Sequence, residues 1–108
     1  MKRGDVVTVA LQGDLGKPRP AVVVQSDLFN DVHPSTVVLP LTSVIESAPL
    51  IRLTVEPSAG NGLLTISQVM IDKPTTIRRD KIGKVIGRLD DDVMLRIGRA
   101  LIVWLGLA

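Results

Sequence analysis

The sequence has no cysteine and no tyrosine, and its 108 residues include one histidine, one phenylalanine and one tryptophan. The absence of cysteine excludes a disulfide framework and any thiolate metal site. The single histidine, His33, excludes the usual clusters of two or three histidine ligands. A serine–histidine–aspartate triad would have to use that one residue.

Long hydrophobic runs are also missing, although 45% of the residues are hydrophobic. The longest apolar stretch, residues 100–105, is far shorter than the roughly 18 residues that a transmembrane helix needs. No apolar signal segment follows the basic start of the chain. Two domains would each be too small to bury a stable core. We therefore expect a single domain, residues 1–108, in the cytoplasm and outside the membrane.

Neither sign of charge is in large excess, since 13 Lys and Arg face 11 Asp and Glu, for a net charge of +2. The positive charges cluster, however, between residues 73 and 88, where Asp80 is the single acidic residue. The basic residues of this stripe are Lys73, Arg78, Arg79, Lys81, Lys84 and Arg88. Such a stripe attracts phosphate backbones, or it is a solvated strand-and-loop face.

Short β-branched segments fill the first four fifths of the chain and predict strands. The expected strands cover residues 5–11, 21–26, 36–41, 50–55, 63–71 and 84–89. Glycine and proline mark a loop over residues 12–20, and a second loop is expected over 27–35. A short turn containing Pro74 and Thr76 precedes the last strand, and Pro40 should end its strand or occupy a bulge.

The C-terminus has the pattern of a helix. Asp90 is a suitable N-cap, and Gly106 fits the C-cap. Spacings of four, four and three place apolar residues on one face: Val93, Ile97, Leu101 and Trp104. Short strands followed by one helix predict a mainly β fold, either a small curved sheet or a partly open barrel. So broad an apolar surface favours a dimer.

Arg19 lies between two prolines at the start of an expected strand. The prolines stiffen the loop, so the guanidinium should have a fixed direction. A planar, permanently charged group suits a phosphodiester and the charge that develops on it during transfer. The alternative is a structural ion pair between Arg19 and Asp27 or Asp5.

Two other positions could carry polar chemistry. Thr42 and Ser43 follow an expected strand, where their hydroxyls could bind a phosphate or cap a short helix. His33 has the pKa range of a general base, although an exposed loop histidine is the simpler interpretation.

Three motifs in register resemble the MazF/PemK family of toxins, and the resemblance covers essentially the whole chain. Residues 1–7 with 16–27 are similar to the opening of that family, Val37–Ser43 to its second motif and Ser67–Ile77 to its third. The resemblance implies an SH3-like barrel with a terminal helix that works as a homodimer. It also implies a sequence-specific endoribonuclease that cuts single-stranded RNA without metal or cofactor. Its partner would be a cognate antitoxin with an acidic or apolar C-terminal segment.

The resemblance also implies site residues. Arg19 and Thr42 match the family's active-site pair, and Ser43 lies beside them. Asp72 matches an acidic position of the third motif. The neighbouring arginine position of the family holds Met70 here, so the general acid and base are not assigned.

RNA-binding proteins of this kind usually stack bases on aromatic rings. Phe29 could stack a base or anchor the core, and Trp104 is expected to pack within the terminal helix. We expect the basic stripe to steer RNA or to hold an acidic antitoxin tail. The predicted RNA-binding residues are Lys17, Gln25, Phe29, Asn30, Lys73, Thr76 and Arg78.

RNA supplies its own nucleophile, the 2′-hydroxyl, so cleavage should leave a 2′,3′-cyclic phosphate or 3′-phosphate and a 5′-hydroxyl, and DNA should survive. Two alternatives remain open. One is a CcdB-like poison of DNA gyrase, suggested by the ending Trp104–Ala108. The other is a small barrel that binds a peptide or nucleic acid without catalysis.

Overall fold

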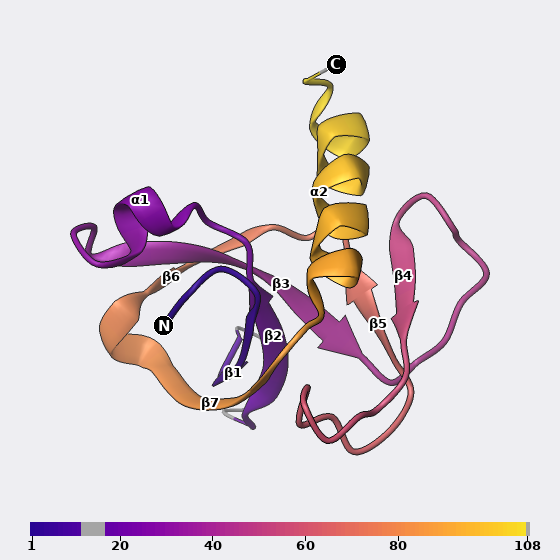
Figure 1. The fold of residues 1–108 in the computed structure, drawn as a ribbon, viewed down its shortest axis with the longest axis horizontal. Coiled ribbons are helices and arrows are strands. Elements are labelled where there is room, and N and C mark those ends of the chain that lie inside the picture. The colour runs from indigo at the N-terminus through magenta and orange to yellow at the C-terminus, as the bar shows by residue number, and fades with distance from the viewer. Residues whose placement is uncertain (12–16, 108) are drawn as a thin grey trace.

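A computed structural model describes residues 1–11 and 17–107, and its fold is mainly β with a C-terminal helix, as predicted (Figure 1). Residues 12–16, part of the predicted first loop, lie outside the described residues. The strands are β1 (Asp5–Val9), β2 (Arg19–Val23), β3 (Ser35–Thr42), β4 (Arg52–Val55), β5 (Ser67–Met70), β6 (Thr75–Arg78) and β7 (Ile82–Arg88). The helices are α1 (Asp27–Asn30) and α2 (Asp91–Leu105), with a 3₁₀ turn, η1 (Arg79–Lys81).

The strands pair antiparallel in the order β4-β5-β3-β2-β1-β7, and β6 also pairs with β3. One edge of β3 pairs with β2. Its other edge serves two partners in turn, first β6 along residues 35–38 and then β5 at Leu41 and Thr42. Figure 1 shows β3 crossing the middle of the molecule as the element common to both groups of strands. The last two residues of β3 are therefore held by β5, just beyond the point where the pairing with β2 ends at Pro40.

Proline at position 40 does not end its strand, because β3 continues to Thr42. Pro40 lies between Val38, the last residue paired with β6, and Leu41, the first paired with β5. On this edge Pro40 therefore lies at a break in the pairing, whereas on the opposite edge it is paired with Ala21 of β2.

Two predictions about strands and loops are wrong. The predicted turn around Thr76 is strand β6, because the first half of β3 offers it an edge. The predicted second loop begins with helix α1, whose N-cap Ser26 accepts a hydrogen bond from the backbone N–H of Leu28 at 3.2 Å. Strand β2 ends at Val23 rather than at residue 26, because the N–H groups of Val24 and Gln25 both donate to the backbone oxygen of Val37, at 3.0 and 3.3 Å, and the regular pairing stops.

Helix α2 follows the predicted bounds, with Asp90 at the N-cap position and Gly106 in the left-handed conformation at the C-cap. Met94 and Ile97 are buried in the main core with β-strand residues such as Leu39 and Val69. The last turn, in contrast, projects beyond the sheet (Figure 1), and Trp104 is 48% exposed rather than packed. Within residues 1–11 and 17–107, no helix has the length and apolar character to cross a membrane.

The carboxylate of Asp27 ties the start of the chain to α1. Its Oδ1 accepts hydrogen bonds from the backbone N–H of Arg3 at 2.7 Å and from Asn30 Nδ2 at 2.8 Å. These bonds, the Arg3 N–H first, hold the pKa of Asp27 below its ordinary value of 3.8. The charged form is therefore favoured in the folded protein. Its stabilising effect is complete above the unfolded pKa and is lost as the pH falls through the folded pKa.

Replacing Asp27 by alanine should lower the free energy of unfolding at pH 7 by roughly 1 kcal/mol, the usual cost of such exposed hydrogen bonds. Because protonation weakens the same bonds, the difference from the wild type should shrink as the pH falls below the unfolded pKa. Urea unfolding at a series of pH values from 7 to 3 measures both curves. If the free energies of unfolding of the wild type and of the variant differ by the same amount from pH 7 to pH 3, the carboxylate does not stabilise the fold through its charge.

Candidate active site

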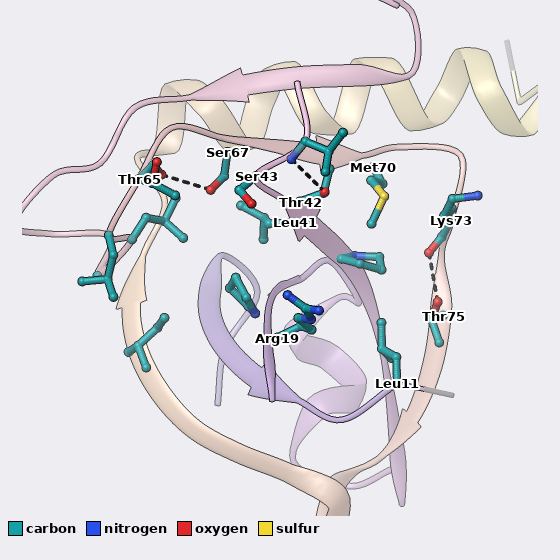
Figure 2. A pocket seen from close by; sticks show the side chains of 17 residues that line it. Leu11, Arg19, Leu41, Thr42, Ser43, Thr65, Ser67, Met70, Lys73 and Thr75 are labelled. Atoms are coloured by element: carbon teal, nitrogen blue, oxygen red, sulfur yellow. Dashed lines mark hydrogen bonds between the residues drawn. The ribbon is translucent and has the colours of Figure 1, made fainter. Parts of the chain in front are cut away.

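A pocket of about 800 Å³ opens where β2 begins and β3 ends (Figure 2). This volume is within the range of small-molecule and nucleotide sites. Its polar and charged lining comes from Arg19, Thr42, Ser43, Thr65, Ser67, Lys73 and Thr75. Apolar walls come from Leu11, Pro20, Pro40, Leu41, Val44, Leu63, Leu64, Met70 and Ile86, and Gly62 completes the lining.

Strand register explains why Arg19 and Thr42 share this pocket. Ala21 of β2 lies opposite Pro40 of β3. Two residues earlier in β2 is Arg19, and two residues later in β3 is Thr42. Because the strands are antiparallel, these two residues lie opposite each other with their side chains on the same face of the sheet. Figure 2 shows the Arg19 guanidinium near the middle of the lining side chains, with Thr42, Ser43 and Met70 on the wall above it.

The two carboxylates predicted as ion-pair partners of Arg19 bond elsewhere. Asp5 Oδ1 accepts from Arg88 Nη1 at 3.2 Å, and Asp27 is held by Arg3 and Asn30. Arg19 itself lines the pocket. The charged lining residues in the described part of the chain, Arg19 and Lys73, are both cationic, which suits an anionic ligand.

The hydroxyl of Thr42 closes a local turn rather than capping a helix. Its Oγ1 accepts the backbone N–H of Val44 at 3.1 Å. A hydroxyl has one hydrogen to donate and two acceptor positions. The Val44 bond uses an acceptor position, so the Thr42 hydrogen remains available for a ligand oxygen in the pocket.

The third motif contributes Ser67, Met70, Lys73 and Thr75 to the pocket but not Asp72. Asp72 Oδ1 forms an ion pair with Arg52 Nη1 at 2.7 Å, and both side chains are largely buried. Arg52 lies on β4 directly opposite Met70. Asp72 therefore has a structural partner, and its predicted role in catalysis stays a prediction.

Several predicted RNA-binding residues gather around α1 instead. Gln25 Nε2 donates to Asn30 Oδ1 and to the backbone oxygen of Ser35, both at 3.1 Å, and Asn30 is 2% exposed. His33 Nδ1 lies 3.1 Å from the hydroxyl of Ser35. These contacts organise the chain between β2 and β3, whereas Phe29 is exposed on α1.

The remaining predicted RNA-binding residues lie outside the pocket lining. Thr76 and Arg78 are exposed on β6, where Arg78 pairs with Asp80 at 2.6 Å. Lys17 is exposed just before β2. Each of these positions stays a prediction.

Three lining hydroxyls, those of Thr65, Ser67 and Thr75, were not predicted. Ser67 is buried at the start of β5 and donates to the backbone oxygen of Thr65 at 3.1 Å. Ser67 is the first residue of the third motif, and this place in the motif could have indicated it as a site residue.

Gly62 also lines the pocket and has a φ of +72°, a conformation that favours glycine. A Cβ at this position would overlap the carbonyl oxygen of Ile86. In the described ranges, no three histidine, aspartate or glutamate side chains gather as a metal site.

The profile of a family described as the PemK-like, MazF-like toxin of type II toxin–antitoxin systems matches residues 2–105. A "probable endoribonuclease MazF" of Mycolicibacterium smegmatis is 45% identical over 109 residues, with 100% of this chain and 99% of that protein covered. The endoribonuclease EndoA of Bacillus subtilis is 29% identical, with 99% and 96% covered. Among solved structures, a mycobacterial endoribonuclease in complex with its cognate antitoxin superposes with a TM-score of 0.84 at 25% identity, covering 100% and 97% of the two chains.

Proposed function

Because the chain belongs to the PemK-like, MazF-like family of toxins, we infer that it is the toxin of a type II toxin–antitoxin pair and an endoribonuclease. The observation that carries its mechanism is the juxtaposition of Arg19 and Thr42 on one pocket of about 800 Å³. We propose that the chain is a single toxin domain, residues 1–108, and that this pocket cleaves single-stranded mRNA in the cytoplasm. The loss of mRNA then arrests growth of the cell.

In this proposal the nucleophile is the 2′-hydroxyl of the nucleotide before the cut. The 2′-hydroxyl loses its proton to solvent as its oxygen attacks the adjacent phosphorus. The bond from phosphorus to the 5′-oxygen of the next nucleotide breaks, that oxygen takes up a proton from solvent, and a 2′,3′-cyclic phosphate forms. Arg19 stabilises the negative charge that grows on the phosphoryl oxygens. The Thr42 hydroxyl donates to one of those oxygens and, with Ser43, fixes the phosphate in position. Neither step requires a metal ion.

The proposed function has better support than either alternative. Both curated relatives described above carry the name of an endoribonuclease, and they match almost the full length of the chain. This favours RNA cleavage over poisoning of gyrase. The shared pocket of Arg19 and Thr42 favours catalysis over a binding module, because it offers a guanidinium and a hydroxyl donor to one phosphate.

Two partners accompany this function. We propose a cognate antitoxin, since the solved mycobacterial relative is bound to one. We also propose a homodimer. The last turn of α2 exposes Val103, Trp104 and Leu105, and a second copy would cover these apolar side chains.

The direct test is incubation of the purified protein, with EDTA present, with a long single-stranded RNA and with DNA of the same sequence. We expect discrete cuts in the RNA alone, mapped by primer extension, with 2′,3′-cyclic phosphate or 3′-phosphate ends. Two unrelated transcripts should be used, because a sequence-specific enzyme needs its motif to be present. If both stay intact, or if cutting requires an added metal, the proposed mechanism is wrong.

A further inference from the structure

The chain leaves β3 at Thr42 and forms a short arch, residues 43–45, before it turns toward β4. Ser43 and Val44 of this arch line the pocket together with Thr42. Residues 43–45 are exposed and belong to no strand or helix. Their position must therefore come from side-chain contacts, since no ladder of backbone hydrogen bonds fixes them.

Both ends of the arch are attached to one residue, Gln68 of β5. At the first end, Thr42 is the last residue of β3 paired with β5, and its partner in the register is Gln68. At the second end, the Gln68 side chain binds the backbone of Glu46 in both directions. Its Oε1 accepts from the Glu46 N–H at 3.0 Å, and its Nε2 donates to the Glu46 carbonyl oxygen at 2.9 Å.

The chemistry of a primary amide suits this position. Gln68 is 3% exposed. Its second N–H donates to Thr54 Oγ1 at 3.1 Å, so one acceptor and two donors are all used. A carboxylate could accept from Glu46 but could not donate to its carbonyl. The amide thus continues the pairing of β3 with β5 beyond the residue where the backbone ladder stops.

The other contact between this segment and the β4–β5 pair is weaker. Arg52 Nη2 lies 3.9 Å from Glu46 Oε2, and the Glu46 side chain is largely exposed. Exposed ion pairs at such distances contribute little. The buried amide of Gln68 is therefore the stronger of these two attachments to the β4–β5 pair.

We propose that Gln68 is a positioning residue of the active site, which holds Thr42, Ser43 and Val44 in the geometry that cleavage requires. The inference rests on the proposed ribonuclease function. Because a displacement of about 1 Å in a catalytic group can lower the rate by about 10²-fold, loss of the amide should act on the chemical step. Binding of the RNA, which extends over a larger surface, should change little.

The test compares Gln68→Met, which keeps the side-chain length without hydrogen bonds, with Thr54→Val. The control removes the third bond of Gln68 and leaves both bonds to Glu46. The substrate is an RNA oligonucleotide that spans a cut mapped on a long transcript. We expect Gln68→Met to lower kcat by about 10- to 100-fold with KM within about threefold, and Thr54→Val to stay within about twofold of the wild type.

Hydrogen exchange supplies a readout that does not depend on cleavage. In Gln68→Met, the backbone amide of Glu46 should exchange at least about tenfold faster, while amides in β1 should not change. If Gln68→Met fails to fold, Gln68→Glu takes its place, since it keeps one of the two bonds to Glu46 and should also lower kcat.

The outcomes separate the two proposals. If the wild type cuts RNA and the Gln68 variant cuts it with the same kcat, the positioning role is wrong and the ribonuclease function stands. Unchanged exchange at Glu46 also overturns the positioning role. If the wild type cuts no RNA, the proposed function fails, and the positioning role fails with it.

Discussion

Replacing Arg19 by alanine is expected to lower kcat for RNA cleavage by about 10²–10³-fold. This is the usual cost of removing one donor that stabilises charge in a transition state. KM should change less, because most of the contact with a long RNA does not involve this side chain. Single-turnover cleavage of an RNA oligonucleotide that contains the mapped cut measures the effect.

The matched control for Arg19 is Arg96→Ala. Arg96 is exposed on α2 and does not line the pocket, so the variant loses the same charge elsewhere. We expect its cleavage rate to stay within about twofold of the wild type. Equal losses in the two variants would mean that Arg19 contributes only net charge, and the catalytic role assigned to its guanidinium would be incorrect.

A single 2′-deoxynucleotide on the 5′ side of the cut should lower the cleavage rate by roughly 10³-fold or more, since it removes the nucleophile itself. The substituted oligonucleotide should still bind. It should compete with the unmodified RNA with an inhibition constant close to KM.

The control for this substitution is an oligonucleotide with the deoxynucleotide two positions away from the cut, which should be cleaved normally. Cleavage at the original rate when the adjacent 2′-hydroxyl is missing would require another nucleophile, such as water. The mechanism based on the 2′-hydroxyl would then have to be abandoned.

Local sequence signals predicted the fold where a single segment determines its own structure. The α2 helix is an example, because Asp90, Gly106 and the apolar spacing between them are all local features. Strand β6 is the opposite case. Thr75–Arg78 has β-branched residues, but it is short and follows Pro74, so it was predicted as part of a turn. It forms a strand along the edge that the first half of β3 offers.

The same distinction applies to the site. Arg19 and Thr42 were predicted from two motifs that are far apart in the chain, and the register of β2 with β3 brings them to one pocket. The direction of a side chain is harder to predict from a motif. Gln25 lies in the first motif and Asn30 follows it in α1, yet these two residues bond to each other. Gln68 escaped prediction because its partner, Glu46, lies 22 residues away.

The pocket is built from nearly the whole length of the chain, from Leu11 to Ile86. Strand β7, among the last parts to be synthesised, pairs with β1, among the first. During translation the early strands leave the ribosome without the wall that Ile86 completes. A given copy of the protein therefore cannot complete its pocket until Ile86 has left the ribosome and β7 has paired with β1.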